Sequence, residues 1–90
     1  MGLVSRTIEE KLKRAFAPES LEVVDDSDRH KGHVGAREGG ETHFTVTLVS
    51  QSFRGLSRIE RQRRINAALA EELAGPVHAL SIRALTPEEA

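Results

Sequence analysis

The chain has 90 residues, contains three phenylalanines but no cysteine, tryptophan or tyrosine, and carries a formal net charge of −1. A chain of this length buries only about 60% of the surface that it exposes when unfolded, so we expect one domain over residues 1–90 and no deep enzyme pocket. The charge balance excludes nucleic-acid binding through bulk positive charge, and the lack of cysteine excludes disulfides, thiol catalysis and cysteine-type metal sites made by this chain alone.

The first predicted element is an amphipathic helix, because apolar side chains recur at helical spacing: Ile8, Leu12, Ala15 and Phe16. Ser5 or Thr7 is the expected N-cap, and Thr7 with Glu10 matches a capping box. Pro18 ends the helix, since the residue before a proline avoids the helical conformation. A short strand over 21–24 follows.

Residues 25–42 are predicted to form an exposed, mobile loop. The segment carries four glycines, several charges and only one apolar side chain larger than alanine. It is long for a hairpin connection, and long loops are frequently functional. Because it contains His30 and His33, it is the first place to look for a site.

The next segment has the two-residue period of a half-buried strand, in which Phe44, Val46 and Leu48 share one face. A second helix is predicted to begin at a capping box formed by Ser57 and Glu60, and to run to Leu73.

On a helical wheel of this second helix, Ile65, Leu69 and Leu73 form one stripe with Ile59 at its edge. Gln62 falls near the middle of the same stripe. We therefore expect Gln62 to face the core as a buried hydrogen-bonding residue.

A last strand is predicted over 77–85, followed by a helical turn that begins at Thr86-Pro87. The element order is α-β-β-α-β, which predicts an α+β sandwich with helices on one face of a three-stranded mixed sheet and a core over about 5–86. The first two strands should pair antiparallel, and the third should return through a right-handed crossover to lie parallel to one of them.

Five segments of the chain form a recognisable series: LEVVDDS, the strand THFTVTLVS, the turn FRGLS, the arginine-rich helix RIERQRRINAALAEEL and the segment VHALSIRALTPEE. Together and in this order they resemble the BolA family. The resemblance covers about residues 8–89. It implies a fold similar to class II KH domains, with a role as partner of monothiol glutaredoxins in handling a 2Fe-2S cluster. Some bacterial members are also described as transcriptional regulators, so DNA binding is the alternative function.

His78 is the sharpest candidate ligand. By alternation it lies in phase with the apolar residues of the last strand, at its first position, where a lone histidine is usually structural. The resemblance implies instead that it is a cluster ligand, since imidazole suits iron. The partner glutaredoxin, with glutathione, would then supply the thiolates, and the isolated chain would hold no cluster.

His30 and His33 form an H-x-x-H pair, although a glycine-rich loop does not fix the geometry of this spacing. Within the family, the chain resembles the subgroup with a histidine ligand in this loop. The number of residues from LEVVDDS favours His30 as that ligand. The number of residues to the following strand leaves His33 as the alternative ligand. His43 is interpreted as a hydrogen-bonding strand residue that organises the loop beside it.

Five arginines gather around the turn at Gly55 and in the first turns of the second helix: Arg54, Arg58, Arg61, Arg63 and Arg64. Positive charge at a helix N-terminus is not stabilised by the helix dipole, so an anionic partner is one interpretation of the cluster and a solvated face is the other. The partner would be nucleic acid, or the acidic surface and glutathione of a glutaredoxin. The turn lacks the second glycine of a G-x-x-G loop, which weakens KH-type RNA binding. Gln62 also departs from the family pattern, because the family commonly has Arg-His-Arg where this chain has Arg61-Gln62-Arg63. A role attributed to that histidine therefore cannot be assigned to this chain.

No Ser-His-Asp arrangement, inward carboxylate pair or phosphate-binding loop can be placed on this fold, so we do not expect an enzyme. No apolar run approaches the length of a membrane span, and the first residues lack the apolar segment of a signal peptide. We therefore expect a cytoplasmic protein without a membrane partner, which is a monomer or weak homodimer when alone.

Overall fold

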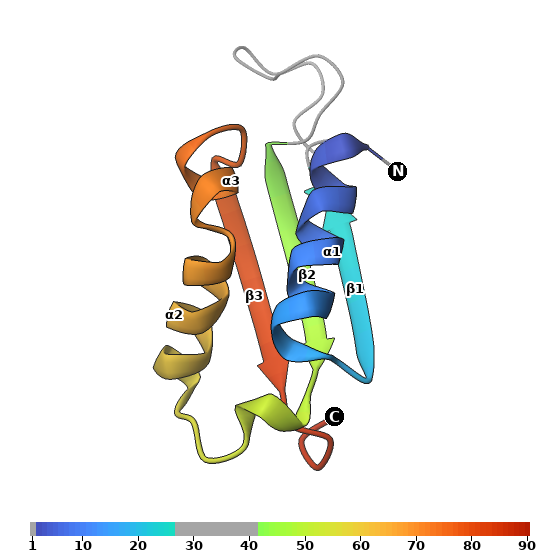
Figure 1. The fold of residues 1–90 in the computed structure, drawn as a ribbon, viewed down its shortest axis with the longest axis vertical. Helices are drawn as coiled ribbons and strands as arrows, with labels where there is room; N and C mark the ends of the chain where they lie inside the picture. Colours follow the sequence, from blue (N-terminus) through green and yellow to red (C-terminus); the bar gives the residue numbers. More distant parts are fainter. Residues whose placement is uncertain (1, 27–41) are drawn as a thin grey trace.

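Three strands form one mixed sheet with β2 (His43–Val49) at its centre (Figure 1). The computed structural model describes residues 2–26 and 42–90. β1 (Ser20–Asp25) pairs antiparallel with β2, and β3 (Ala79–Leu85) pairs parallel with β2. This topology confirms the α+β class, the antiparallel pairing of the first two strands and the parallel return of the third, which pairs with β2.

The helices lie over one face of the sheet and close the core. α1 (Leu3–Phe16) crosses β1 and β2, while α2 (Arg58–Ala68) and the short α3 (Ala70–Ala74) lie beside β3 (Figure 1). The 3-10 helix η2 (Gln51–Phe53) leads from β2 towards α2. Apolar side chains from the strands, helices and connections form the buried core: Ile8, Leu12, Phe16, Phe44, Val46, Leu48, Phe53, Ile65, Leu69 and Val77. Within residues 2–26 and 42–90, no helix is long and apolar enough to cross a membrane.

The first helix begins earlier than the capping pattern predicts. Its N-cap is Gly2, no side chain caps it, and Ser5 is buried inside the helix. The Thr7 hydroxyl donates to the carbonyl oxygen of Leu3 at 2.9 Å, within the helix that it was expected to cap. The additional turn packs Val4 against the core, and this apolar contact outweighs the local capping preference.

The second predicted helix is interrupted. The Ser57 hydroxyl accepts from the N–H of Glu60 at 3.2 Å, so the predicted N-cap is confirmed. α2 nevertheless ends at Ala68, because Leu69 adopts φ −107° and ψ 21°, and a separate helix begins at Ala70.

This break explains why the expectation for Gln62 is wrong. The helical wheel continued one stripe through Leu69 and Leu73, which lie beyond the end of α2. Within α2, Ile65 is the buried residue, whereas Gln62 is exposed and Ile59 is 62% exposed. The inner face of α2 is therefore rotated away from Gln62.

Candidate functional site

Two histidines meet at one end of the sheet. His43 begins β2, and His78 directly precedes β3. Because β2 and β3 are parallel, their first residues lie at the same sheet end, with His43 opposite Ala79. The imidazole centroids are 6.5 Å apart and the rings are close to perpendicular, at 69°. The structure thus brings together two histidines to which the sequence assigns separate roles.

The backbone holds this histidine pair in place. The carbonyl oxygen of Thr42 accepts from the N–H of His78 at 2.8 Å and from that of Ala79 at 3.2 Å. The Thr42 hydroxyl also lies 2.9 Å from Nδ1 of His43 and orients that half-buried ring. The side chain of His78 is exposed, so its imidazole is accessible to another molecule.

His30 and His33 lie outside the described residues. The segment that contains them joins the end of β1 to the start of β2, where Asp25 is paired with Phe44. At this junction the hydroxyl of Thr45 donates to the carboxylate of Asp26. Both attachment points of the segment are therefore at the histidine end of the sheet.

The described donors do not complete a metal site. Among residues 2–26 and 42–90, no group of three or more histidine, cysteine, aspartate or glutamate side chains could hold a metal ion. The chemistry of the donor set at this end is that of nitrogen ligands without thiolates. Such a set fits part of an iron-sulfur coordination sphere, provided that another molecule supplies sulfur ligands.

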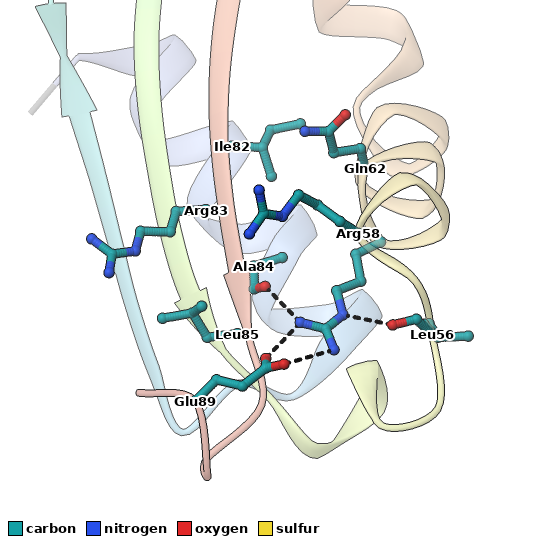
Figure 2. Close-up of a pocket in the computed structure, with 9 residues that line it drawn as sticks. Leu56, Arg58, Gln62, Ile82, Arg83, Ala84, Leu85 and Glu89 are labelled. Carbon is teal, nitrogen blue, oxygen red and sulfur yellow. Dashed lines mark hydrogen bonds and ion pairs between the residues drawn. The ribbon is translucent and has the colours of Figure 1, made fainter.

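At the opposite end of the sheet, Arg61 ties α2 to the C-terminal turn (Figure 2). Its Nε donates to the carbonyl oxygen of Leu56, and its Nη1 to that of Ala84, both at 3.0 Å. The guanidinium also binds both carboxylate oxygens of Glu89, at 2.6 and 3.2 Å. This side chain is only 12% exposed. Arg61 is therefore engaged within the fold.

The same contacts control the charge of Glu89. The Arg61 guanidinium, followed by the N–H of Thr86, lowers the pKa of the Glu89 carboxyl from 4.5 to about 2. That N–H donates to the carboxylate at 2.8 Å. Glu89 thus remains ionised at neutral pH and balances the charge of Arg61.

The remaining arginines of the predicted cluster are divided between paired and unpaired side chains. Arg54 forms an ion pair with Glu88, and Arg63 forms one with Glu60 at 3.3 Å. Arg58 and Arg64 have no carboxylate partner within the described part of the chain. Gly55 adopts φ 76°, a left-handed conformation that favours glycine in this turn.

An open cavity of about 700 Å³ lies between α2, β3 and the C-terminal turn (Figure 2). Arg58, Arg61 and Gln62 line it from the helix, and Ile82 and Ala84 line it from the strand. Gln62, predicted to be a core residue, is instead part of this cavity wall.

Comparison with known proteins places the chain in one family. A family model described as BolA-like protein matches residues 12–89. BolA-like protein 1 of Pongo abelii is 51% identical over 89 residues, which cover 99% of this chain and 62% of the relative. The DNA-binding transcriptional regulator BolA of Escherichia coli (strain K12) is 46% identical over 87 residues, which cover 97% of this chain and 79% of that protein.

Solved structures agree with these sequence relatives. The BolA domain of SufE1 from Arabidopsis thaliana superposes with a TM-score of 0.88 at 43% identity and covers 100% of this chain and 99% of that domain. The present chain therefore spans a whole BolA domain, although it spans only about 62% of the length of the mammalian relative. The family model, the sequence identity and the structural superposition lead to one assignment: this chain belongs to the BolA family.

Proposed function

We propose that this chain is an adaptor that binds a monothiol glutaredoxin and shares a 2Fe-2S cluster with it. The observation that carries the proposal is the exposed His78, held by backbone hydrogen bonds at the sheet end beside His43, in a chain without cysteine. An accessible imidazole on a backbone that is already held in place can bind iron without the cost of ordering that backbone.

The ligand chemistry explains why a partner is needed. Iron-sulfur clusters are held mainly by thiolates, and histidine replaces cysteine in some 2Fe-2S proteins. This chain can supply His78 and a histidine of the 27–41 segment, His30 or His33. The glutaredoxin, together with glutathione, would supply the sulfur ligands. The cluster is cargo shared between the two proteins.

His43 serves as a positioning residue in this proposal. Its ring lies beside that of His78 and is itself oriented by Thr42. An edge-to-face ring neighbour at this separation restricts the orientations that a ligand imidazole can adopt.

DNA-binding regulation is the second candidate function, because relatives from Escherichia coli and Vibrio cholerae are named as DNA-binding transcriptional regulators. In this chain Arg58 and Arg64 could contact phosphate. The ion pairs of Arg54, Arg61 and Arg63, together with the net charge of −1, reduce the electrostatic attraction to DNA. We therefore rank this function second.

Anaerobic reconstitution tests the adaptor function. The chain, a monothiol glutaredoxin and an equimolar mixture are each supplied with iron, sulfide and glutathione, and visible circular dichroism is recorded. We expect the mixture to give a 2Fe-2S spectrum that differs from that of glutaredoxin alone. The chain alone should form no stable cluster, because imidazoles without thiolates are poor cluster ligands. A stable, stoichiometric cluster on the isolated chain would contradict the proposal.

A further inference from the structure

We propose that the cavity between α2 and β3 docks an extended, acidic segment of a partner protein, which adds to the free edge of β3 and places a carboxylate on Arg58. This site is distinct from the histidine end of the sheet. The proposal depends on three features: the unpaired edge of β3, the charge of the cavity and its size.

The backbone of β3 presents an available hydrogen-bonding position at its outer edge. On the inner side, the carbonyl oxygen of Leu85 accepts from the N–H of Ser50, which follows β2, at 2.9 Å. Backbone groups of successive strand residues point to alternate edges, so those of Ala84 and Ile82 point outward. The hydrogen bond from Arg61 to the carbonyl oxygen of Ala84 agrees with this direction. None of the hydrogen bonds within residues 2–26 and 42–90 engages the outward N–H and C=O of Ile82.

The charges that line the cavity favour an anionic occupant. Arg61 is neutralised by Glu89, whereas Arg58 has no carboxylate partner among the residues that the structure describes. Figure 2 shows the guanidinium of Arg58 directed towards β3, between Ile82 and Ala84. Arg83 contributes to the wall of the cavity, but its guanidinium points to the other side of the strand (Figure 2). The cavity thus has one uncompensated cation beside an open strand edge.

An extended peptide matches this combination better than a free anion does. A volume of about 700 Å³ exceeds the space that a single inorganic ion fills. In strand addition, the peptide backbone pairs with the sheet edge and its side chains occupy neighbouring pockets. Here Ile82 would supply the backbone contacts, Arg58 a charge-assisted hydrogen bond and Gln62 a further donor or acceptor. Because Arg61 already occupies the carbonyl oxygen of Ala84, the paired stretch must be short.

The position of the cavity leaves the histidine end accessible. β3 extends from Ala79 beside the histidine pair to Leu85 beside the cavity, a span of about 20 Å. A segment bound at Arg58 would not cover His78. The docking proposal can therefore be tested independently of cluster sharing with a glutaredoxin.

Fluorescence anisotropy with the full chain tests this docking site. The probe is a short fluorescein-labelled peptide in which glutamate and valine alternate. We expect a Kd below about 1 mM for the wild type. Arg58→Gln should raise the Kd about five- to tenfold, because it removes a charge-assisted hydrogen bond. Arg64→Gln is the matched control, since Arg64 lies on the same helix, has no carboxylate partner in the described ranges and is not part of the cavity wall. Its Kd should stay within about twofold of the wild type.

Two further measurements distinguish strand addition from simple charge attraction. A probe with N-methylated backbone amides should bind more weakly than the unmodified probe, and the amide resonance of Ile82 should shift on binding of the unmodified probe. Absence of binding, an equal loss in Arg58→Gln and Arg64→Gln, or equal affinity for the N-methylated probe would each overturn the proposal. Tighter binding of a single-stranded oligonucleotide that displaces the peptide would also overturn it, in favour of nucleic acid as the occupant.

Discussion

The N–H of His78 is held by the carbonyl oxygen of Thr42, whereas His30 and His33 are two histidines close together in the sequence, so their replacement should have different effects. We expect His78→Ala to abolish or strongly alter the visible circular dichroism of the cluster shared with glutaredoxin, because among the described residues no other histidine lies beside His43 at the start of β3. Replacing His30 alone should give a weaker, more labile cluster, since His33 can substitute for it. Only the double replacement should match the effect of His78→Ala.

Thermal unfolding is the control for these histidine variants. The imidazole of His78 is exposed, so its replacement should change the free energy of unfolding by less than about 0.5 kcal/mol. A wild-type cluster spectrum from a folded His78→Ala variant would show that His78 is structural.

Arg61 should stabilise the fold, although it belongs to an arginine-rich segment that could equally be a solvated face. We expect Arg61→Ala to lower the free energy of unfolding by about 1–3 kcal/mol, because the variant loses charged donors to the carbonyl oxygens of Leu56 and Ala84. Arg64→Ala, an exposed change in the same helix, should stay within about 0.5 kcal/mol. Urea unfolding of both variants at neutral pH provides the comparison, and equal effects would refute the structural role of Arg61.

The ion pair between Arg61 and Glu89 should make the free energy of unfolding depend on pH. Folding lowers the pKa of this carboxyl from 4.5 to about 2. Its contribution is therefore present above pH 4.5 and is lost as the pH falls through about 2. The difference in unfolding free energy between wild type and Glu89→Gln should shrink over this interval. A difference that stays constant from neutral pH to pH 2 would exclude the ionised carboxylate as its source.

At the scale of elements, Lys11 joins α1 to α3. Its Nζ lies 2.8 Å from the carboxylate of Glu72, which is largely buried, and 3.3 Å from that of Glu71. The hydrogen bond to Glu72 raises the pKa of Lys11 above 10.5, so this contribution is present below that pH and is lost as the pH rises through the folded-state value.

We expect Lys11→Gln to destabilise the fold more than Lys13→Gln, because it leaves the Glu72 carboxylate buried without its cation. Lys13 is the matched control in the same helix, where its exposed pair with Glu9 contributes about 0.3–0.5 kcal/mol. The midpoints of urea unfolding at pH 7 show which of the two variants is less stable. If Lys13→Gln proved the more destabilising, the link between α1 and α3 would not be a stabilising contact.

The elements also show which parts of the structure local sequence can predict. The alternation of Phe44, Val46 and Leu48 reports burial directly, and the β2 strand forms as expected. No proline or glycine lies at the break at Leu69, so the sequence does not indicate that α2 ends there. A helical wheel drawn through the break therefore misplaces the inner face of α2. The start of α1 differs from the local capping signals because packing of Val4 against the core extends the helix by a turn.

The candidate site illustrates the same limit. His78 was identified as a residue to test, but its proximity to His43 depends on the parallel register of two strands that are distant in sequence. Likewise, the pairing of Arg61 with Glu89 depends on where the C-terminal turn returns to the fold. A charge cluster in sequence does not show which of its members already have partners.

At the scale of the whole molecule, the near-neutral charge limits binding to DNA. We expect affinity to be weak, independent of sequence and strongly reduced between about 50 and 200 mM salt. Replacement of Arg58 and Arg64 with glutamine should weaken binding further and flatten the salt dependence, whereas replacement of Arg63, paired with Glu60, should have a smaller effect. Electrophoretic mobility shifts over a salt series measure both effects. Tight, sequence-selective binding near physiological salt would reverse the ranking of the two proposed functions.

The parallel pairing of β2 with β3 has a consequence for the order in which the protein matures. Among the three strands that the structure describes, β3 is synthesised last, and it joins the sheet only after α2 and α3 have been synthesised. The β1-β2 hairpin can form earlier, because its strands are joined without a crossover. A chain that stops before His78 would therefore retain His43 but lack its neighbour, so both imidazoles can be presented to a metal-carrying partner only after β3 has been synthesised and has paired with β2.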